Sequence, residues 1–534
     1  MGRTRLFWGP INPRLTHTTA RRLPNASQGG RPSIGMALAT GLSACLATGA
    51  WLPTWAAGNG GPTFTAPAAE APGRALHLSF AEAMKRTLSQ NPAMDLSQAR
   101  IAEARAAIEQ ANGNLLPTLD LSFGVMGSNN PLNVFGMKLQ QEQASFNDFG
   151  VSEFFQKFNQ GDQAGAFATE PDSLNDPGWH HNFQTSLKLS VPIYNGGKIR
   201  EMRTQAQALL QAAEAGDQAA RQQLVLHTIE AYAGINTAEA FVEVARQAKN
   251  AARSFRDLSQ TLFDEGVVTK SDLLKAKVNL GERELSLADA RNQAENAADG
   301  LKVLTGIDTS RAIDLTETID VALPETDLAR ARQRALDNNP RIQALRGRVE
   351  AARAEVDVAR ADYKPHVNLM AQQDFNDESL GLENESYTIG GQLTWRIFDF
   401  GARSGKVNRA QAKVNASLAE RQQALDKLLG QVGKVWREAN MAEKRVEVRQ
   451  LAIEQSEEAV RLETLRYQQG LATMTELLAA QTELDNARAE LIRAHFQRTM
   501  QRAALWLALG ELASDRVATD HDNAILDVLA GAAH

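Results

Sequence analysis

The feature that most constrains this fold is a junction that occurs twice, in which alternating apolar and polar residues end in glycine and lead into a long helical pattern. The two copies are residues 187–197 (LKLSVPIYNGG) and 392–401 (QLTWRIFDFG). Alternation with a period of two is typical of a strand whose two faces meet different environments. No proline follows until at least Phe263 in the first copy and Tyr467 in the second. At ~1.5 Å per residue each helix would be about 100 Å long, which no compact domain contains.

The junction belongs to an internal repeat, and repeats of this length determine how the rest of a chain is interpreted. Landmarks recur in the same order, and they are Asn91-Pro92 with Asn339-Pro340, Pro117 with Pro365, Gly266 with Gly470, and Gly306 with Gly510. The first copy carries an insertion at about 126–182, rich in Asn, Gly, Asp and Phe, which reads as a long loop without a period. We predict repeats at 78–306 and 326–510, a connector at 307–325 and a tail at 511–534.

Each repeat is predicted to contain the same series of elements. A short helix starts at an N-cap candidate, Ser79 or Asp327, and a second helix starts at the proline after Asn91 or Asn339. Two strands follow, and then the long helix, a glycine turn and a return helix with N-cap candidates Ser271 and Thr475.

The strands lie at 119–125, 183–193, 367–372 and 387–397 and alternate over about ten residues. This length suits tilted strands that cross an outer membrane. A soluble antiparallel sheet with one wet face fits the same alternation. The long helices equally fit a soluble coiled-coil rod. The pattern alone leaves both alternatives open.

Residues 1–57 have the layout of a secretory signal peptide, since arginines precede an uncharged apolar run at 34–57 and no acidic residue occurs. We therefore expect an exported protein, with a linker at 58–77. Cys45 stands in a Leu-Ser-Ala-Cys sequence that resembles a lipoprotein box, in which the cysteine would be lipidated, although the apolar run that continues to Trp55 favours the first of the alternatives that follow. Two alternatives are a small apolar residue inside the signal core and a retained membrane helix, because the run approaches the ~20 residues that span a bilayer.

Composition and motifs exclude several classes of function. The net charge is −6 without a basic face, which argues against a nucleic-acid partner. The single cysteine excludes a disulfide framework and a thiolate metal site in the body of the chain. Loop histidines such as His180 and His181, without further ligands, are more often solvated than metal-bound. No phosphate-binding loop or nucleophile with a positioned base is visible, so we predict no enzyme and no cofactor.

The doubled order of elements resembles the TolC-like outer membrane efflux protein family over residues 78–510. The motifs that carry the resemblance are Asn91-Pro92, residues 191–197 (VPIYNGG), residues 467–473 (YQQGLAT) and their repeats. The resemblance implies an α+β membrane protein that forms a homotrimer. Each protomer would give four strands to a 12-stranded outer membrane β-barrel, and the helices would continue it as a periplasmic tunnel.

The implied function is an exit duct for a tripartite drug efflux pump or a type I protein secretion system. The implied partners are a periplasmic adaptor (membrane fusion) protein, an inner membrane pump or ABC exporter, and outer membrane lipid. The alternative from the residues alone is a soluble or surface coiled-coil scaffold protein.

By position, the resemblance also implies a periplasmic entrance or gate formed by Glu476, Asp272 and Tyr467. The position of the family's locking arginine is Ala472 in this chain, and that of its second entrance acid is Ala479. For Glu476 and Asp272 a second role fits the sequence equally, because acids in the first turn of a helix are favoured by the helix dipole.

Overall fold

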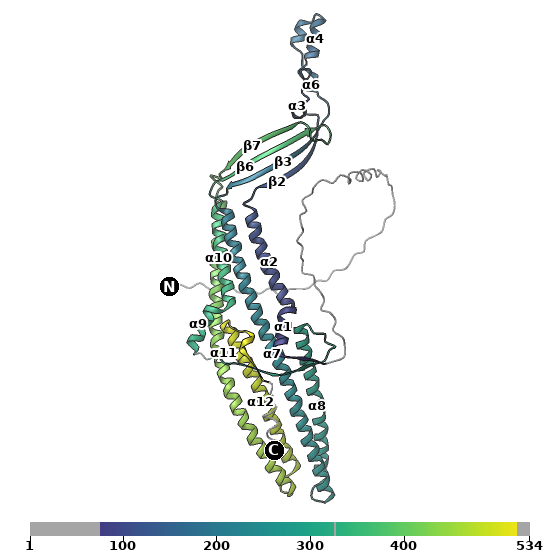
Figure 1. Cartoon of the computed structure of the whole chain (residues 1–534), viewed down its shortest axis with the longest axis vertical. Coiled ribbons are helices and arrows are strands. Elements are labelled where there is room, and N and C mark those ends of the chain that lie inside the picture. Colours follow the sequence, from purple (N-terminus) through teal and green to yellow (C-terminus); the bar gives the residue numbers. More distant parts are fainter. Residues whose placement is uncertain (1–74, 325–326, 521–534) are drawn as a thin grey trace, which may run out of the picture. The chain divides into compact units, whose positions relative to one another are not determined.

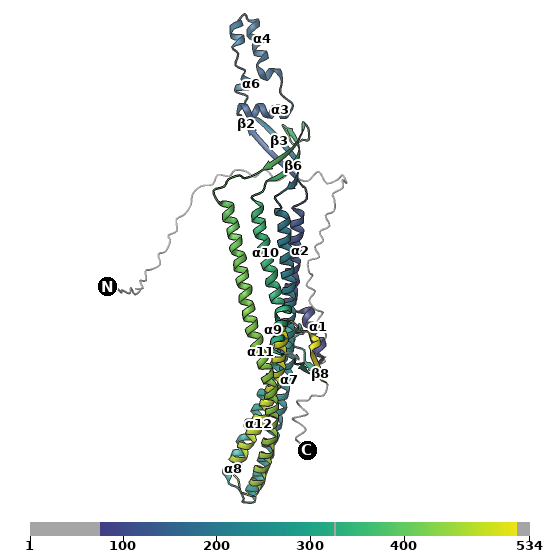
Figure 2. The same cartoon turned by 90° about the vertical axis from the view of Figure 1, so that its left-hand side faces the viewer.

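The computed structural model describes residues 75–324 and 327–520. The expected signal peptide with Cys45, most of the linker and residues 521–534 lie outside the described residues. The described part belongs to one compact unit, 72–534, which we describe by itself. Figures 1 and 2 show its helices and strands from two directions.

The short and medium helices start where their caps predict. They are α1 (Phe80–Gln90), α2 (Pro92–Gly113), α9 (Leu328–Asn338) and α10 (Pro340–Ala361). The Ser79 hydroxyl accepts the Glu82 amide at 3.2 Å, and the Asn91 side chain accepts the Ala93 amide at 3.0 Å. These caps satisfy backbone donors that the first turn of a helix leaves free. The predicted starts at Ser79, Asn91, Asp327 and Asn339 are confirmed.

Four longer helices form two hairpins. They are α7 (Lys198–Asp264), α8 (Lys270–Thr305), α11 (Ala402–Gln468) and α12 (Met474–Leu509). The helices α7 and α11 have 67 residues each, as the proline-free stretches predict. Buried alanines such as Ala212, Ala439 and Ala442 let helix backbones approach closely.

The strands form one antiparallel sheet in the order β2-β3-β6-β7. Their bounds are β2 (Thr118–Ser128), β3 (His180–Tyr194), β6 (His366–Asp377) and β7 (Glu385–Thr394). The strand predicted to continue to Ile397 ends at Thr394. Beyond it the chain bonds to helix ends instead, because the Trp395 indole donates to the Tyr363 carbonyl at 3.0 Å and Arg403 donates to the Ile397 carbonyl at 3.2 Å.

The two copies of the junction are tied to each other where strand becomes helix. Gly197 and Gly401 cap α7 and α11 with φ of 86° and 96°, a left-handed conformation that favours glycine. Asp362, at the end of α10, accepts Lys198 of α7 at 3.1 Å and Lys406 of α11 at 2.5 Å. These cations hold the pKa of Asp362 below its usual value against the opposing effect of burial.

The sequence predicts a loop without secondary structure for the insertion in the first repeat, and this prediction is wrong. It contains α3 (Pro131–Gln140), the 3₁₀ turn η1 (Phe146–Phe149), α4 (Val151–Asn159), α5 (Gln163–Phe167) and α6 (Asp172–Asn175). Each has at most 10 residues, which is too short for a helical period to show in the sequence. Asn130 and Asp162 cap two of them.

The connector and the tail add two small sheets around the middle of the helices. The strand β1 (Leu76–Leu78) pairs in parallel with β4 (Ile313–Leu315), and β5 (Thr318–Val321) pairs antiparallel with β8 (Val517–Asp520). The largest hydrophobic core lies here, with Leu78, Tyr232 and Leu505 among its buried members. The Tyr232 hydroxyl donates to the Leu78 carbonyl at 3.1 Å.

Ion pairs fix the connector to the second hairpin. Asp320 of β5 lies 3.0 Å from Arg498 and 2.8 Å from Arg502 of α12, and Arg502 reaches Glu443 of α11 at 2.7 Å. Burial and the neighbouring arginines lower the pKa of His495 to about 4, so this imidazole is neutral at neutral pH.

Among the described residues, no helix combines the length and apolar character that crossing a bilayer requires.

Gly510 and Gly266 provide a matched test of the packing at the ends of the hairpins. Both have positive φ, but a Cβ on Gly510 would lie 2.6 Å from the Asn338 carbonyl, whereas a Cβ on Gly266 meets nothing within 4 Å. We expect Gly266→Ala to cost about 1–2 kcal/mol of unfolding free energy through the left-handed conformation alone. Gly510→Ala should cost more, because the backbone of α9 must also shift. Unfolding followed by circular dichroism in detergent measures both, and equal losses would contradict this packing.

Candidate functional site

The register of the sheet separates its polar and apolar residues onto different faces. On one face Asp120 lies opposite Lys188, and Ser122 lies opposite Ser186. Gln184 also donates to Asp374 at 3.2 Å on this face. The opposite face carries larger apolar side chains, including Leu119, Leu121, Leu187, Ile389 and Leu393. The sheet is therefore two-sided across all four strands.

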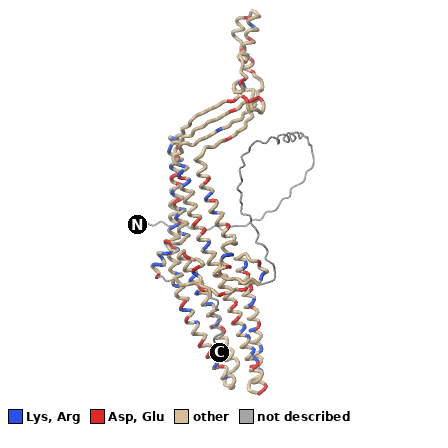
Figure 3. Tube along the Cα trace, viewed as in Figure 1, with Lys and Arg blue, Asp and Glu red and all other residues tan. Residues whose placement is uncertain are grey.

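Most of the large apolar side chains of this sheet are exposed rather than buried. Leu121 is 65 % exposed and Ile389 is 86 % exposed, and the neighbouring Leu119, Phe123, Val125 and Leu393 are also exposed. A soluble sheet with one wet face would cover its apolar side and expose its polar side. An apolar face of this extent marks a contact with lipid or with another chain. Figure 3 shows the contrast, since charges of both signs are mixed along the helices and the strands are mostly uncharged.

The hairpin turns at the other ends of the long helices carry two similar capping boxes. The Thr269 hydroxyl lies 2.7 Å from the Asp272 carboxylate, and the Thr473 amide donates to Glu476 at 2.6 Å. The N-caps are thus Thr269 and Thr473, and the predicted caps Ser271 and Thr475 are wrong. The reciprocal bond with an acid three residues on decides the start of each helix.

Each predicted entrance acid therefore belongs to a capping box, Asp272 at the start of α8 and Glu476 at the start of α12. Glu476 is exposed, and its bonds from the Thr473 amide and hydroxyl, with a smaller contribution from Arg466, lower its pKa. The same geometry is found for Asp272, which is half-buried. The capping role suggested by the helix dipole is observed for both residues.

Tyr467 lies inside the protomer. It is 1 % exposed and belongs to an apolar cluster with Phe255, Leu262 and Leu477. Its hydroxyl lies 2.9 Å from the Ser259 hydroxyl, so Tyr467 links α11 to α7. Burial raises the pKa of the tyrosine, and the nearby Asp272 adds to the effect. Ala472, at the position of the family's arginine, packs against the same cluster.

The two hairpins are joined near their tips by polar side chains that sequence reasoning missed. Arg283 of α8 lies 3.3 Å from the Asp485 carboxylate of α12 and donates to the Thr482 hydroxyl at 3.3 Å. Asp485 is buried and accepts Gln481 at 2.8 Å. We call this the inter-hairpin tie, Arg283–Asp485. No sequence signal distinguishes it, because both residues look like the solvated charges of an ordinary helix face.

Burial raises the pKa of Asp485, while Gln481, Arg283 and Arg488 act in the opposite direction. Desolvation is the larger effect, as expected for a carboxyl group removed from water. The tie thus contains an acid that protonates more readily than an exposed aspartate.

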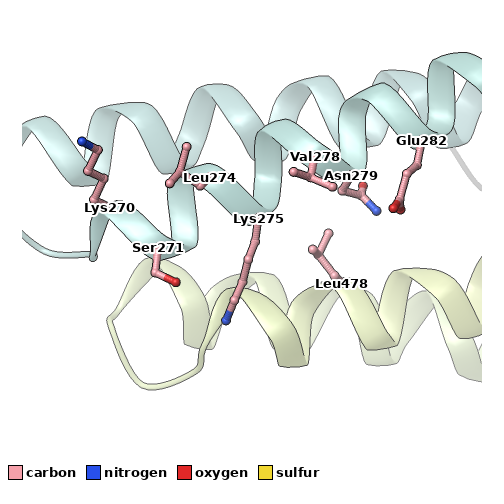
Figure 4. A pocket seen from close by; sticks show the side chains of 8 residues that line it. All are labelled: Lys270, Ser271, Leu274, Lys275, Val278, Asn279, Glu282 and Leu478. Atoms are coloured by element: carbon pink, nitrogen blue, oxygen red, sulfur yellow. The ribbon is translucent and has the colours of Figure 1, made fainter.

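A groove of about 570 Å³ lies at the tip between α8 and α12. Its lining combines an apolar floor with polar edges, and Figure 4 shows Leu478 of α12 pointing toward α8. Leu274 and Val278 stand one helical turn apart on α8, with Lys270 and Lys275 beside them. Two lysines and Glu282 thus give the groove a net positive edge around its apolar residues.

Within the ranges 75–324 and 327–520, no cluster of His, Cys, Asp and Glu has the composition of a metal site. His180 contacts Gln141, at 2.7 Å, where the insertion meets the sheet. The site is thus made of surfaces, namely a two-sided sheet and two joined hairpin tips.

Comparisons with known proteins agree with this architecture. The sequence pattern of the family described as "Outer membrane efflux protein" matches residues 83–307 and 331–511. The outer membrane protein VceC of Vibrio cholerae has a similar fold, with a TM-score of 0.65 and 24 % identity over 81 % of this chain and 96 % of that chain.

Two further relatives are similar in sequence at comparable identity. The alkaline protease secretion protein AprF of Pseudomonas aeruginosa is 24 % identical over 341 residues, which are 62 % of this chain and 70 % of AprF. The outer membrane protein TolC of Escherichia coli is 27 % identical over 212 residues, which are 39 % of this chain and 36 % of TolC.

The family match covers both repeats, and the described elements follow the order predicted from the sequence. The chain therefore belongs to the outer membrane efflux protein family, and it is a non-enzymatic outer membrane channel, with a periplasmic helical tunnel, of the kind that serves tripartite efflux and type I secretion systems.

Proposed function

We propose that three copies of this chain close their sheets into one 12-stranded β-barrel in the outer membrane and continue it as a helical tunnel through the periplasm. The observation that carries the proposal is the sheet with two free edges. The outer strands β2 and β7 each pair with one neighbour only, and nearly all of their residues are exposed. Unpaired backbone groups are very costly in lipid, so both edges must find partner strands.

The two faces of the sheet support the same assembly. In a closed barrel the apolar face, with Leu121 and Ile389, would meet lipid, and the polar face, with Lys188 and Asp374, would line the lumen. Four strands are too few to enclose a lumen, whereas twelve leave room for a passage. A soluble coiled-coil scaffold would leave the apolar face in water at considerable cost.

We further propose that the hairpin tips form the periplasmic entrance. Glu476 and Asp272 would stand around this entrance as capping acids, and Tyr467 would hold α11 against α7 behind it. Since Ala472 and Ala479 replace the family's arginine and second acid, the inter-hairpin tie Arg283–Asp485 is the interaction that we expect to keep the hairpins together.

The groove at the tip is our proposed docking site for a periplasmic adaptor protein, which would connect the channel to an inner membrane pump or ABC exporter. Its apolar floor and its two lysines favour a helix that presents apolar residues one turn apart, flanked by acids. The inner membrane partner would supply the energy for transport.

Asp485→Asn tests the tie, because it removes the charge and preserves the shape of the side chain. Loss of an ion pair that couples to opening by about 1–3 kcal/mol shifts the opening equilibrium by roughly 5- to 150-fold. We expect a higher open probability of single channels in planar bilayers at pH 7. Because its pKa is raised, Asp485 loses its charge early as the pH falls, so the native channel should open on acidification and Asp485→Asn should not respond.

Thr473→Ser serves as the control for this experiment, since it keeps the neighbouring capping box and leaves the tie intact. A native channel that does not respond to pH, or an Asp485→Asn channel with native open probability, would contradict the gating role of the tie. Formation of channels by every variant would still support the duct.

The double substitution L274S/V278S tests the adaptor groove. Both side chains form its floor, and removing two apolar contacts should weaken adaptor binding by roughly tenfold or more. Leu285→Ser is the matched control, because Leu285 is an exposed residue of α8 outside the groove. Binding of the adaptor that co-purifies with the native channel is measured by surface plasmon resonance. Equal affinities for the three proteins would show that the groove is not the adaptor site.

A further inference from the structure

The insertion at 129–179 has an anchored base. The Gln141 side chain is buried and donates to the His181 carbonyl at 2.8 Å and to the Asn182 side chain at 2.9 Å, which fixes α3 to strand β3. Asn182 in turn donates to Asn376 of β6 at 2.9 Å. Lys138 and Asp148 form an ion pair at 2.7 Å between α3 and η1. Hydrogen bonds and an ion pair therefore fix the base of the insertion to the end of the sheet.

The distal part of the insertion is a small helical hairpin made of α4 and α5, which we call the aromatic hairpin. The Phe154 ring stacks on Phe158 at 5.9 Å and meets Phe167 edge-on at 5.4 Å. No residue of α4 is buried, and Phe155 and Phe167 are 55 % and 79 % exposed. The apolar side of α4 packs on α5 only in part, and the rings of Phe155, Phe158 and Phe167 remain exposed, which marks an interaction surface.

The aromatic hairpin carries fewer charged residues than the base of the insertion. Residues 151–167 contain one glutamate, one lysine and Asp162, which caps α5. The base holds most of the acidic residues, including Glu142, Glu170, Asp172 and Asp176. A nearly neutral surface can meet identical copies of itself without repulsion between like charges. The hairpin is thus suited to self-association, and its few charges give no basis for a strongly charged partner.

The position of the hairpin argues against lipid as the occupant. Figures 1 and 2 both place α4 farther from the strands than α3 and α6, beyond the end of the sheet that is opposite the long helices. The strands are the part that would cross the membrane, so the hairpin stands outside the bilayer. The insertion also leaves from β2, an edge strand, which would form the seam with the next copy.

We propose that the aromatic hairpins of the three copies pack on one another through Phe155, Phe158 and Phe167 and form a cap over the outer mouth of the channel. This inference rests on the proposed trimer. Each hairpin is tethered to the rim of the same mouth, so the local concentration of its partners is on the order of millimolar. Weak apolar contacts are then sufficient to close the cap, and they can open when a substrate passes.

The cap is tested by photo-cross-linking of the full chain. The photoreactive residue p-benzoylphenylalanine replaces Phe155 in one variant, and in the control it replaces Leu132 of α3, which is 80 % exposed in the same insertion. After illumination of the detergent-purified protein, the Phe155 variant should give covalent dimers and trimers on a denaturing gel, and the Leu132 variant should not. Adding F158S/F167S to the Phe155 variant should abolish the adducts.

Native mass spectrometry of the same samples separates the two proposals. An intact trimer without adducts at position 155, or with adducts only to lipid or to a different protein, overturns the cap and leaves the proposed function in place. A protein found only as single chains overturns both. Conductance gives a second measure, since F155S/F158S/F167S should show fewer brief closures in planar bilayers than the native channel, and unchanged closures contradict the cap.

Discussion

Backbone hydrogen bonding at the edges of the sheet is the constraint on which the rest of this structure depends. A strand in a bilayer must pair on both sides, because water is not available to its amides and carbonyls. The strands β2 and β7 pair on one side only. The apolar face of the same sheet is exposed. A stable assembly must therefore cover this face with lipid and also pair the two free edges. A single chain satisfies neither requirement, and the proposed assembly of three satisfies both.

The helical part follows from how each strand is converted into a helix. The glycines at 197 and 401 turn the chain in a left-handed conformation, and Asp362 binds the first turns of both long helices. The helices then diverge into two hairpins whose tips are joined again by Arg283 and Asp485. The protomer is thus fixed where strand meets helix, and at the tips the two hairpins share a buried apolar cluster that contains Phe255, Tyr467 and Leu477. In the proposed channel, rearrangement of the tip contacts would open the entrance while the junctions hold the strands in place.

Much of this architecture could be predicted from the sequence, because long helices, caps and strands leave strong local signals. The proline-free stretches, the caps at Ser79 and Asn91 and the doubled order were predicted correctly. The helices of the insertion were missed because they are short, and the caps Thr269 and Thr473 were missed because Ser271 and Thr475 are also good N-cap residues two positions later. The tie between Arg283 and Asp485 could not be predicted, since it depends on the relative rotation of α8 and α12, which are far apart in the sequence.

The central claim is that one chain supplies only a third of a closed sheet, and the mass of the intact assembly tests it most directly. Native mass spectrometry of protein extracted from outer membranes in mild detergent should give three times the mass of the mature chain, and heating should convert it to single chains. A stable species of one chain in detergent, with the edges of β2 and β7 accessible to hydrogen exchange, would contradict the account.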